Sequence, residues 1–183
     1  MRFRREVGAG AHVEYLAQII INSLFVSKGH RPDTALTLVL ENASDYSRAI
    51  TLSGDSLGDL GPITEAHILD CLAECLTEAE GLAKEASVNS RRGMILRAIS
   101  FEHLVKGCLA EAPVYLLDRK GTDIRSVDLA SDAVILLTDH VPIAPKLRKS
   151  LLRQGVQTMS LGPVMLHASQ CVVIVQNEVD RQQ

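Results

Sequence analysis

Two short polar segments, each following an apolar run, contain the residues of this sequence best suited to chemistry. Asp139 and His140 follow the run "DAVILLT", and the loop "SLGP" (160–163) follows "VQTM". Asp139 could accept a proton or interact with a positive charge, whereas His140 could cap the next helix. Gly162 allows close backbone approach to a ligand, and Pro163 stiffens the turn. The two segments could form a small-molecule site, or they could be ordinary turns between elements.

A second group of reactive side chains suggests a metal site, but its spacing argues against one. His67, Cys71 and Cys75 recur every four residues and would share one face of a helix. His67 and Cys75 would then be about 12 Å apart along the helix axis, which is too far for one tetrahedral ion. We therefore expect core packing and no metal.

A serine hydrolase is the remaining catalytic alternative. It would need a triad, for which the candidates are Ser160, His167 and Asp139. The sequence has no G-x-S-x-G elbow and no identifiable oxyanion loop, so this chemistry is disfavoured.

Composition limits the class of protein. The chain has 183 residues, 46% hydrophobic and 22% charged, and a net charge of −3. We expect one globular domain, and an RNA-binding face would have to be local. There is no apolar run of the roughly 20 residues that would span a bilayer, and no signal peptide, so we expect a cytoplasmic protein. The four cysteines are too few for a disulfide framework, so we expect reduced thiols.

Hydrophobic periodicity predicts alternating helices and strands. The expected helices are residues 11–30, 64–80 with Thr64 as N-cap, 100–109 capped by Ser100, and 144–155. The expected strands are residues 35–41, 48–54, 112–118, 132–140 and 156–161, with a turn at "RKGTD". Strands separated by helices predict an α/β fold with a mostly parallel sheet flanked by helices. The domain would span 1–183; the hairpin region 34–54 could be an elaboration, and 81–94 a mobile connection.

The final apolar segment, "CVVIV", is ambiguous because a buried strand and a buried helix look alike over five residues. Its flanks favour a helix, since "LHASQ" and "QNEVDRQQ" extend it beyond the length of a typical strand. The residues that would share one helical face are Ala168, Cys171, Val172, Val175 and Val179.

Six blocks occur in an order that resembles a known family. They are "INSLFVSKGHRPD", "LSGDSLGDLGP", "ISFEHL", "YLLDRKGTDIRSV", "ILLTDH" and "SLGPVMLHASQCVVIVQNEVDR". Over nearly the whole chain they are similar to the archaeal tRNA pseudouridine N1-methyltransferases and their bacterial relatives. That family belongs to the SPOUT superfamily of S-adenosylmethionine enzymes, and the C-terminal block is the most specific of the six.

The resemblance implies a C-terminal deep trefoil knot, a homodimer, and S-adenosyl-L-methionine bound between the loop after "ILLTDH" and the "SLGP" loop. The implied reaction is methylation of N1 of a pseudouridine in tRNA. Two alternatives stay open: a methyltransferase acting on rRNA, and a knotted RNA-binding or ribosome-assembly protein without turnover. The second is motivated by Thr138, which stands where the archaeal motif has glycine, and by the altered segment "GAGAHVE".

The site residues follow from the resemblance and from residue chemistry together. The expected cofactor-binding residues are Leu136, Leu137, Thr138, Gly155, Ser160, Leu161, Gly162, Pro163, Leu166 and Cys171. Asp139 is the first candidate for a general base, and Glu14 the second. Seven basic residues could flank a cleft and contact the phosphates of RNA. Alternatively, they could form an ordinary solvated surface without an RNA partner. They are Arg2, Arg4, Arg5, Lys28, Arg31, Arg91 and Arg92.

Overall fold

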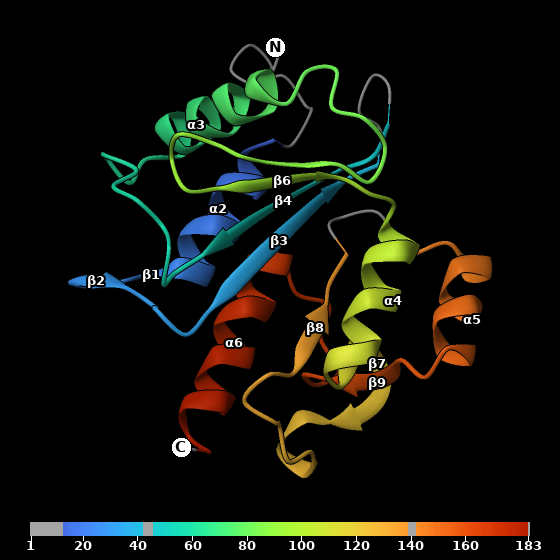
Figure 1. The fold of residues 1–183 in the computed structure, drawn as a ribbon. Helices are drawn as coiled ribbons and strands as arrows, with labels where there is room; N and C mark the ends of the chain where they lie inside the picture. Colours follow the sequence, from blue (N-terminus) through green and yellow to red (C-terminus); the bar gives the residue numbers. More distant parts are fainter. Residues whose placement is uncertain (1–12, 42–45, 139–141, 183) are drawn as a thin grey trace. The chain divides into compact units, whose positions relative to one another are not determined.

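The computed structural model describes residues 13–41, 46–138 and 142–182. The chain forms two compact units, Met1–Phe101 and Glu102–Gln183, where the sequence predicted one domain. Figure 1 shows their elements in chain order. The first unit contains the larger sheet and the second contains the C-terminal helix.

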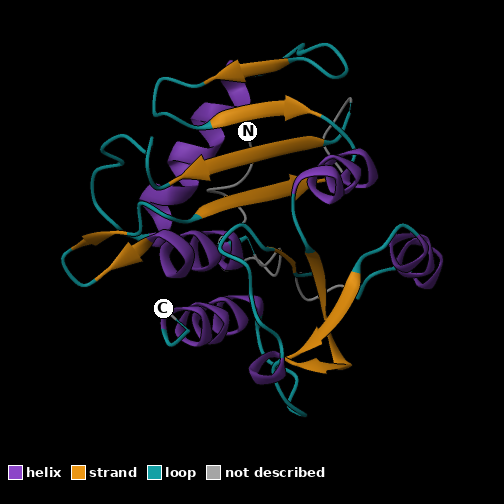
Figure 2. Cartoon of the chain, turned by 60° about the horizontal axis from the view of Figure 1, so that its bottom comes forward, coloured by secondary structure: helices purple, strands orange, loops and turns teal. Residues whose placement is uncertain are grey.

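Over residues 13–41 and 46–101, the first unit combines two helices with a two-stranded and a four-stranded sheet. Its elements are α2 (Glu14–Leu24), β1 (Phe25–Val26), β2 (Gly29–His30), β3 (Ala35–Leu40), β4 (Arg48–Ser53), α3 (Glu65–Glu78), β5 (Ser87–Asn89) and β6 (Ile95–Ala98). The sheet order is β3-β4-β6-β5, and every neighbouring pair is antiparallel. Figure 2 shows these strands beside α2 and α3. Helix α2 packs against α3 and β3, and the core side chains include Ile20, Ile50, Leu69 and Leu96.

Several predictions for this unit are confirmed and others need correction. The hairpin of residues 35–41 and 48–54 is present as β3 and β4. These strands form half of the four-stranded sheet of the first unit. The predicted mobile connection at 81–94 contains β5 and a turn that leads into β6. The first helix ends at Leu24, earlier than expected, because the chain turns there into the β1–β2 hairpin.

Helix α3 begins where the sequence placed its N-cap. The Thr64 side chain accepts a hydrogen bond from the His67 backbone N–H at 3.3 Å, which satisfies a donor that the first helical turn leaves free. Cys71 and Cys75 are buried on this helix, and burial raises the pKa of the Cys75 thiol to about 11. The His67 ring lies 2.6 Å from the Leu60 carbonyl oxygen. These side chains therefore serve packing, as the spacing argument predicted.

The second unit contains the parallel sheet. Its elements are α4 (Phe101–Glu111), β7 (Val114–Asp123), the short 3₁₀ helix η1 (Ile124–Ser126), β8 (Val134–Leu136), α5 (Pro145–Arg153), β9 (Gln157–Ser160) and α6 (Ala168–Asp180). The order is β8-β7-β9, with both pairs parallel. The prediction of a mostly parallel sheet thus holds for this unit alone. The helices predicted at 100–109 and 144–155 are present as α4 and α5, and α4 begins directly after Ser100.

Strand β7 continues through the segment that was predicted to be a turn. Leu117 and Thr122 both pair with Met159 of β9, so residues 118–121 form a bulge in β7. At Gly121 the β7 backbone lies against β9, since a Cβ added there would be 2.5 Å from the Met159 nitrogen. Only glycine fits such a close backbone approach. The predicted turn at "RKGTD" is therefore a bulge within β7, and the strand continues on both sides of it.

The last helix, α6, confirms the helical interpretation of "CVVIV". Val175 of α6 and Leu161 pack against the buried cluster of Tyr115, Ile124 and Met159. Near its C-terminal end, the buried Glu178 accepts a hydrogen bond from the Arg125 Nε atom at 2.9 Å, and the Arg125 Nη2 atom lies 2.9 Å from the same carboxylate oxygen in an ion pair. These contacts fix α6 to η1 and to the parallel sheet.

Candidate functional site

The carboxyl ends of β8 and β9 define the candidate site in the second unit. Leu136 of β8 pairs with Leu116 of β7, and Met159 of β9 pairs with Leu117. Both strands therefore end beside the same part of β7, and the loops that follow them leave the same edge of the sheet. With strands about 4.8 Å apart, the loops leave roughly 10 Å from each other on either side of β7. Ligands of parallel α/β sheets gather at this edge.

The "SLGP" loop is held in place by the side chain of Ser160. The Ser160 hydroxyl oxygen is 3.1 Å from the Gly162 backbone nitrogen, which donates to it. The same hydroxyl can donate to the carbonyl oxygen of Arg119 at 3.3 Å or to that of Gly162 at 3.4 Å. The Ser160 side chain therefore stabilises the turn that follows β9. The hydroxyl also joins the loop to the bulge of β7.

Gly162 has the backbone geometry that the loop prediction requires. Its φ angle is +117°, and no heavy atom lies within 4 Å of the position that a Cβ would occupy. The backbone is therefore open on that side, and a side chain there would be strained. Pro163 is exposed, while Leu166 and Cys171 are half-buried. Burial raises the pKa of the Cys171 thiol, so this residue provides a neutral, weakly polar wall.

Not all predicted cofactor residues lie together. Gly155 precedes β9, so it lies beyond the opposite end of that strand, roughly 16 Å from Ser160 along the chain. Leu161 packs into the core of the unit, which removes much of its side chain from any ligand surface. Leu136 is buried, Leu137 is half-buried and Thr138 is exposed. The β8 end and the loop that begins at Ser160 lie at this edge, Leu166 and Cys171 follow later in that loop and in α6, and Asp139 and His140 lie outside the described residues.

Glu14 shows an unusual feature within the first unit. Its Oε2 atom is buried, and among the described residues it has no hydrogen-bond partner. A buried acceptor without a partner costs about 1–3 kcal/mol, so such atoms are rare unless they have another role. Glu14 also lies in the first turn of α2, where a carboxylate is favoured by the helix dipole. Sequence reasoning named this residue, but its unpartnered oxygen could only come from coordinates.

Those of the proposed RNA-contacting arginines that lie in the described residues already interact with other parts of the chain. Arg92 donates to Glu74 at 2.9 Å, and the Arg91 side chain lies 3.7 Å from Glu78, so both pair with α3. Arg31 takes part in at least one non-covalent interaction within the protein. Its carbonyl oxygen lies next to Gly54. Arg2, Arg4 and Arg5 lie outside the described residues. The exposed basic residues of α5 were not singled out, although "PKLRKSLLR" has four basic residues and no acidic one.

A charged pair joins α5 to the bulge of β7. Arg148 donates to the Asp118 Oδ2 atom from Nε at 3.0 Å and from Nη2 at 2.6 Å. The Lys120 backbone N–H donates to the Asp118 Oδ1 atom at 2.9 Å. The Lys120 hydrogen bond, followed by the Arg148 pair, lowers the pKa of Asp118. The pair was missed from sequence because Asp118 and Arg148 are 30 residues apart.

We expect Asp118→Asn to destabilise the protein by about 1 kcal/mol at neutral pH, since it weakens charge-assisted hydrogen bonds. Because the folded-state pKa is lowered, this contribution is present above the unfolded pKa of about 3.9 and is lost as pH falls through the folded pKa. Urea unfolding from pH 7 to pH 3 measures it. Asp128→Asn is the control, since Asp128 is exposed. A deficit that persists undiminished at pH 3 would contradict the assignment.

Two further functional classes find no support within the described ranges. Residues 13–41, 46–138 and 142–182 contain no group of three or more His, Cys, Asp or Glu side chains that could hold a metal ion. In the same residues, every helix is too short or too polar to cross a bilayer.

Comparison with known proteins gives a consistent result. The sequence model of a family described as "Putative SAM-dependent RNA methyltransferase" matches residues 3–183. A relative from Shewanella frigidimarina, named "Putative pseudouridine methyltransferase", is 40% identical over 98% of this chain and 90% of its own length. A relative of the same name from Vibrio vulnificus is 41% identical over 97% of this chain and 89% of its own length.

A solved structure shows a related fold. The crystal structure of Archaeoglobus fulgidus Nep1 bound to S-adenosylhomocysteine superposes with a TM-score of 0.59 at 12% identity. The match covers 93% of this chain and 70% of that one. At this identity the match shows a shared fold alone.

Proposed function

The chain belongs to the family of S-adenosylmethionine-dependent RNA methyltransferases, and we propose that it methylates N1 of a pseudouridine in tRNA in the cytoplasm. The pseudouridine substrate is supported by the names of relatives about 40% identical over almost the whole chain. The observation that carries the proposal is the loop pair at the carboxyl edge of the parallel sheet, with Gly162 open on one side. Because the family model spans both units, we treat them as one catalytic domain.

The residues at this edge fit the chemistry of an adenosine-bearing cofactor. Apolar side chains at Leu136, Leu137 and Leu166 suit the adenine ring, and open backbone at Gly162 can supply polar contacts to its edge. Cys171 adds a neutral wall. When bound, S-adenosylmethionine supplies an electrophilic methyl group on a positively charged sulfur. Orienting the acceptor nitrogen in line with that methyl is the main task of the protein, and good alignment contributes roughly 7–11 kcal/mol.

Proton removal is the second task. Pseudouridine is attached to ribose through carbon, so its N1 carries a hydrogen. As the new N–C bond forms and the S–C bond breaks, that proton must pass to a base. We propose a carboxylate as this base, with Asp139 and Glu14 as the candidates. Glu14 is supported by its buried Oε2 atom, which can accept a hydrogen bond that no described residue supplies.

We propose that the C-terminal segment of the second unit is threaded as a deep trefoil knot, as the family resemblance implies. The shared fold with Nep1 supports a SPOUT-type architecture. The threaded region would include the β9–α6 loop, in which the Ser160 hydroxyl is within hydrogen-bond distance of both Arg119 and Gly162. Its threading would lock this loop beside the end of β8.

We further propose a homodimer formed through apolar residues of the second unit. Val164, Met165 and Val173 are 68%, 74% and 48% exposed, although they are large and apolar. Exposed apolar side chains that gather in one patch mark interaction sites, and we infer that a second copy buries these three. We expect Met165→Glu combined with Val173→Glu to convert a dimer into a folded monomer in sedimentation velocity. A wild-type monomer at micromolar concentration would contradict this proposal.

The decisive test of function is transfer of a labelled methyl group to RNA. Matched tRNA transcripts carrying pseudouridine or uridine at the same position would be compared, together with rRNA fragments. We expect labelling of the pseudouridine-containing tRNA, with 1-methylpseudouridine identified by mass spectrometry of nucleosides. Labelling of rRNA alone would show that the substrate is rRNA and would contradict the proposed tRNA substrate. Cofactor binding by calorimetry without labelling of any RNA would favour the alternative of an RNA-binding or ribosome-assembly protein.

A further inference from the structure

Helix α5 concentrates positive charge in an otherwise acidic protein. Its nine residues include Lys146, Arg148, Lys149 and Arg153 and no acidic residue, whereas the whole chain has a net charge of −3. Its apolar side chain Leu151 is fully buried, so one face of the helix is fixed against the unit. The charge is therefore local and lies on a rigid element.

The four basic residues of α5 divide into two roles. Arg148 is bound to Asp118 and so fixes the helix to β7. Lys146, Lys149 and Arg153 are exposed, and among the described residues none of the three forms an ion pair. Their spacing of three and four residues places them on one side of the helix over about 10 Å. We call these three residues the α5 basic stripe.

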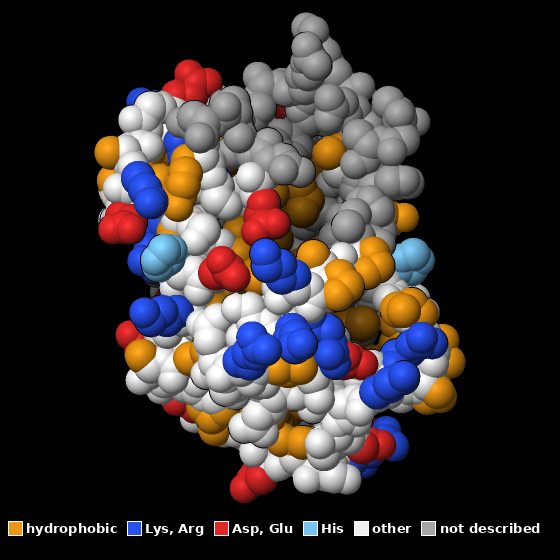
Figure 3. All heavy atoms as spheres, turned by 90° about the vertical axis from the view of Figure 1, so that its right-hand side faces the viewer, with side chains coloured by type: hydrophobic (Ala, Val, Ile, Leu, Met, Phe, Trp, Pro, Cys, Tyr) orange, Lys and Arg blue, Asp and Glu red, His pale blue; other side chains and the backbone are white. Residues whose placement is uncertain are grey.

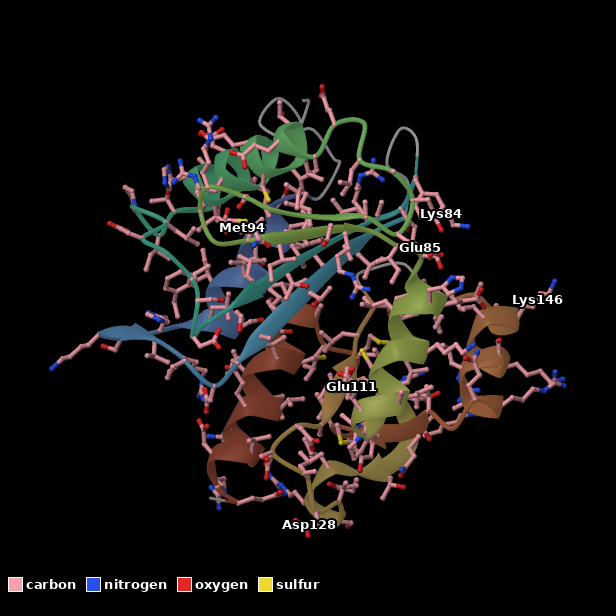
Figure 4. The ribbon with its side chains drawn as sticks, viewed as in Figure 1. Lys84, Glu85, Met94, Glu111, Asp128 and Lys146 are labelled. Carbon is pink, nitrogen blue, oxygen red and sulfur yellow. The ribbon has the colours of Figure 1, made fainter. Side chains whose placement is uncertain are left out.

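The three residues of the basic stripe are exposed to solvent. In Figure 4, the labelled Lys146 side chain extends outward from α5 and away from its neighbours. Figure 3 views the side on which α5 faces the reader, and Lys and Arg side chains gather there. Arg119 and Lys120 of the β7 bulge are also exposed. Since Asp118 contacts Arg148, this bulge lies against α5 and extends the positive surface.

A chain of hydrogen bonds connects α5 to the candidate cofactor loop. Arg148 binds Asp118, the next residue Arg119 accepts a hydrogen bond from Ser160, and Ser160 holds the Gly162 backbone. The positive surface is therefore anchored to the same β7 bulge that holds the "SLGP" loop. A polyanion lying on it would be placed with respect to that loop by rigid contacts.

We propose that the α5 basic stripe binds the phosphate backbone of the RNA substrate and positions it for methyl transfer. This inference rests on the proposed function. Backbone contacts by Lys and Arg supply sequence-independent affinity and orientation, and each releases condensed counterions. The stripe differs from the arginines predicted from sequence, since Arg91 and Arg92 are paired with glutamates of α3.

The test is the salt dependence of RNA binding by a triple variant, Lys146→Glu/Lys149→Glu/Arg153→Glu. With the pseudouridine-containing tRNA transcript as the probe, we expect Kd to rise at least about tenfold at roughly 0.1 M salt. The slope of log K against log salt should shrink by roughly 0.7–0.9 for each phosphate that is no longer neutralised, or about two in total. In methyl transfer, KM for RNA should rise while kcat at saturating RNA stays within about twofold.

A charge-matched variant provides the control. Lys84→Glu/Arg97→Glu/Lys106→Glu reverses three exposed basic residues outside α5 and changes the net charge equally. Circular dichroism and calorimetric binding of S-adenosylmethionine would verify that both variants fold. Equal losses of RNA affinity in the two variants, or an unchanged salt slope in the α5 variant, would overturn the inference. If the wild-type protein binds RNA through the basic stripe but transfers no methyl group to any RNA, the proposed function is wrong. The inference that the stripe binds RNA would still hold.

Discussion

Glu14→Gln is expected to lower kcat for RNA methylation by a factor of about 10² to 10⁴ and to leave S-adenosylmethionine affinity unchanged. General base catalysis contributes about that much, and glutamine keeps the shape of the side chain while losing its ability to take a proton. The buried Oε2 atom of Glu14 has no partner among the described residues, which is costly for folding and leaves the atom free to accept a proton. Single-turnover rates of methyl transfer at saturating RNA and cofactor measure the effect.

Glu14 also has a purely structural explanation, and the same variant separates the two. A carboxylate in the first turn of α2 stabilises the helix by about 0.3–1 kcal/mol through the helix dipole. If that is its whole role, Glu14→Gln will lower stability slightly and leave kcat intact. Glu65→Gln is the matched control, since Glu65 lies in the first turn of α3 and its Oε1 atom is already bonded to Gln18. A rate loss confined to Asp139→Asn would assign the base to Asp139 and contradict the Glu14 proposal.

The helices were predictable because their signals are local. Thr64 caps α3 where the sequence placed it, and α5 ends just before Gly155. The flanks of "CVVIV" correctly indicated a helix for α6. In each case, the period of the apolar residues and the signals at the helix ends lie within a short stretch of sequence. No knowledge of the rest of the chain was needed.

Strands β5 and β6 were missed because each has one side in water. In "SVN" only the central residue is partly covered, and in "ILRA" buried and exposed residues alternate over four positions. Patterns this short are weak, and the polar residues between them indicate a loop equally well. Their antiparallel pairing, with β6 beside β4, places them in a sheet separate from the expected parallel one.

The candidate site was predictable in part, and the rest depends on contacts between distant residues. Gly162 and Ser160 were visible as a loop signal, and the family resemblance gave that loop a ligand. Which basic residues are neutralised was not visible, since Arg92 meets Glu74 and Arg148 meets Asp118 only in the folded chain. The unpartnered oxygen of Glu14 was also not visible in the sequence, because it depends on which residues of the folded chain lie around it.

Gly121→Ala is expected to destabilise the protein by about 2–3 kcal/mol, at the upper end of overpacking costs. The added Cβ would lie 2.5 Å from the Met159 nitrogen and 2.6 Å from the Thr158 carbonyl carbon, so the backbone of β7 or β9 must move. Met159 is fully buried, which leaves β9 little room to yield. For a chain of this size, the loss corresponds to a fall in Tm of roughly 5–10 °C by differential scanning fluorimetry.

The same substitution should weaken S-adenosylmethionine binding, because the β7 bulge also holds the loop after β9. Arg119 accepts a hydrogen bond from Ser160, and Ser160 holds Gly162, so a shift of the bulge moves the loop that is proposed to bind the cofactor. Gly107→Ala is the control in the same unit, since no atom lies within 4 Å of its added Cβ and alanine favours the helix. We expect that variant to keep wild-type Tm or exceed it, with unchanged cofactor affinity by calorimetry. If Gly121→Ala lowers Tm but binds S-adenosylmethionine as tightly as Gly107→Ala does, the bulge supports the sheet and has no part in the cofactor site.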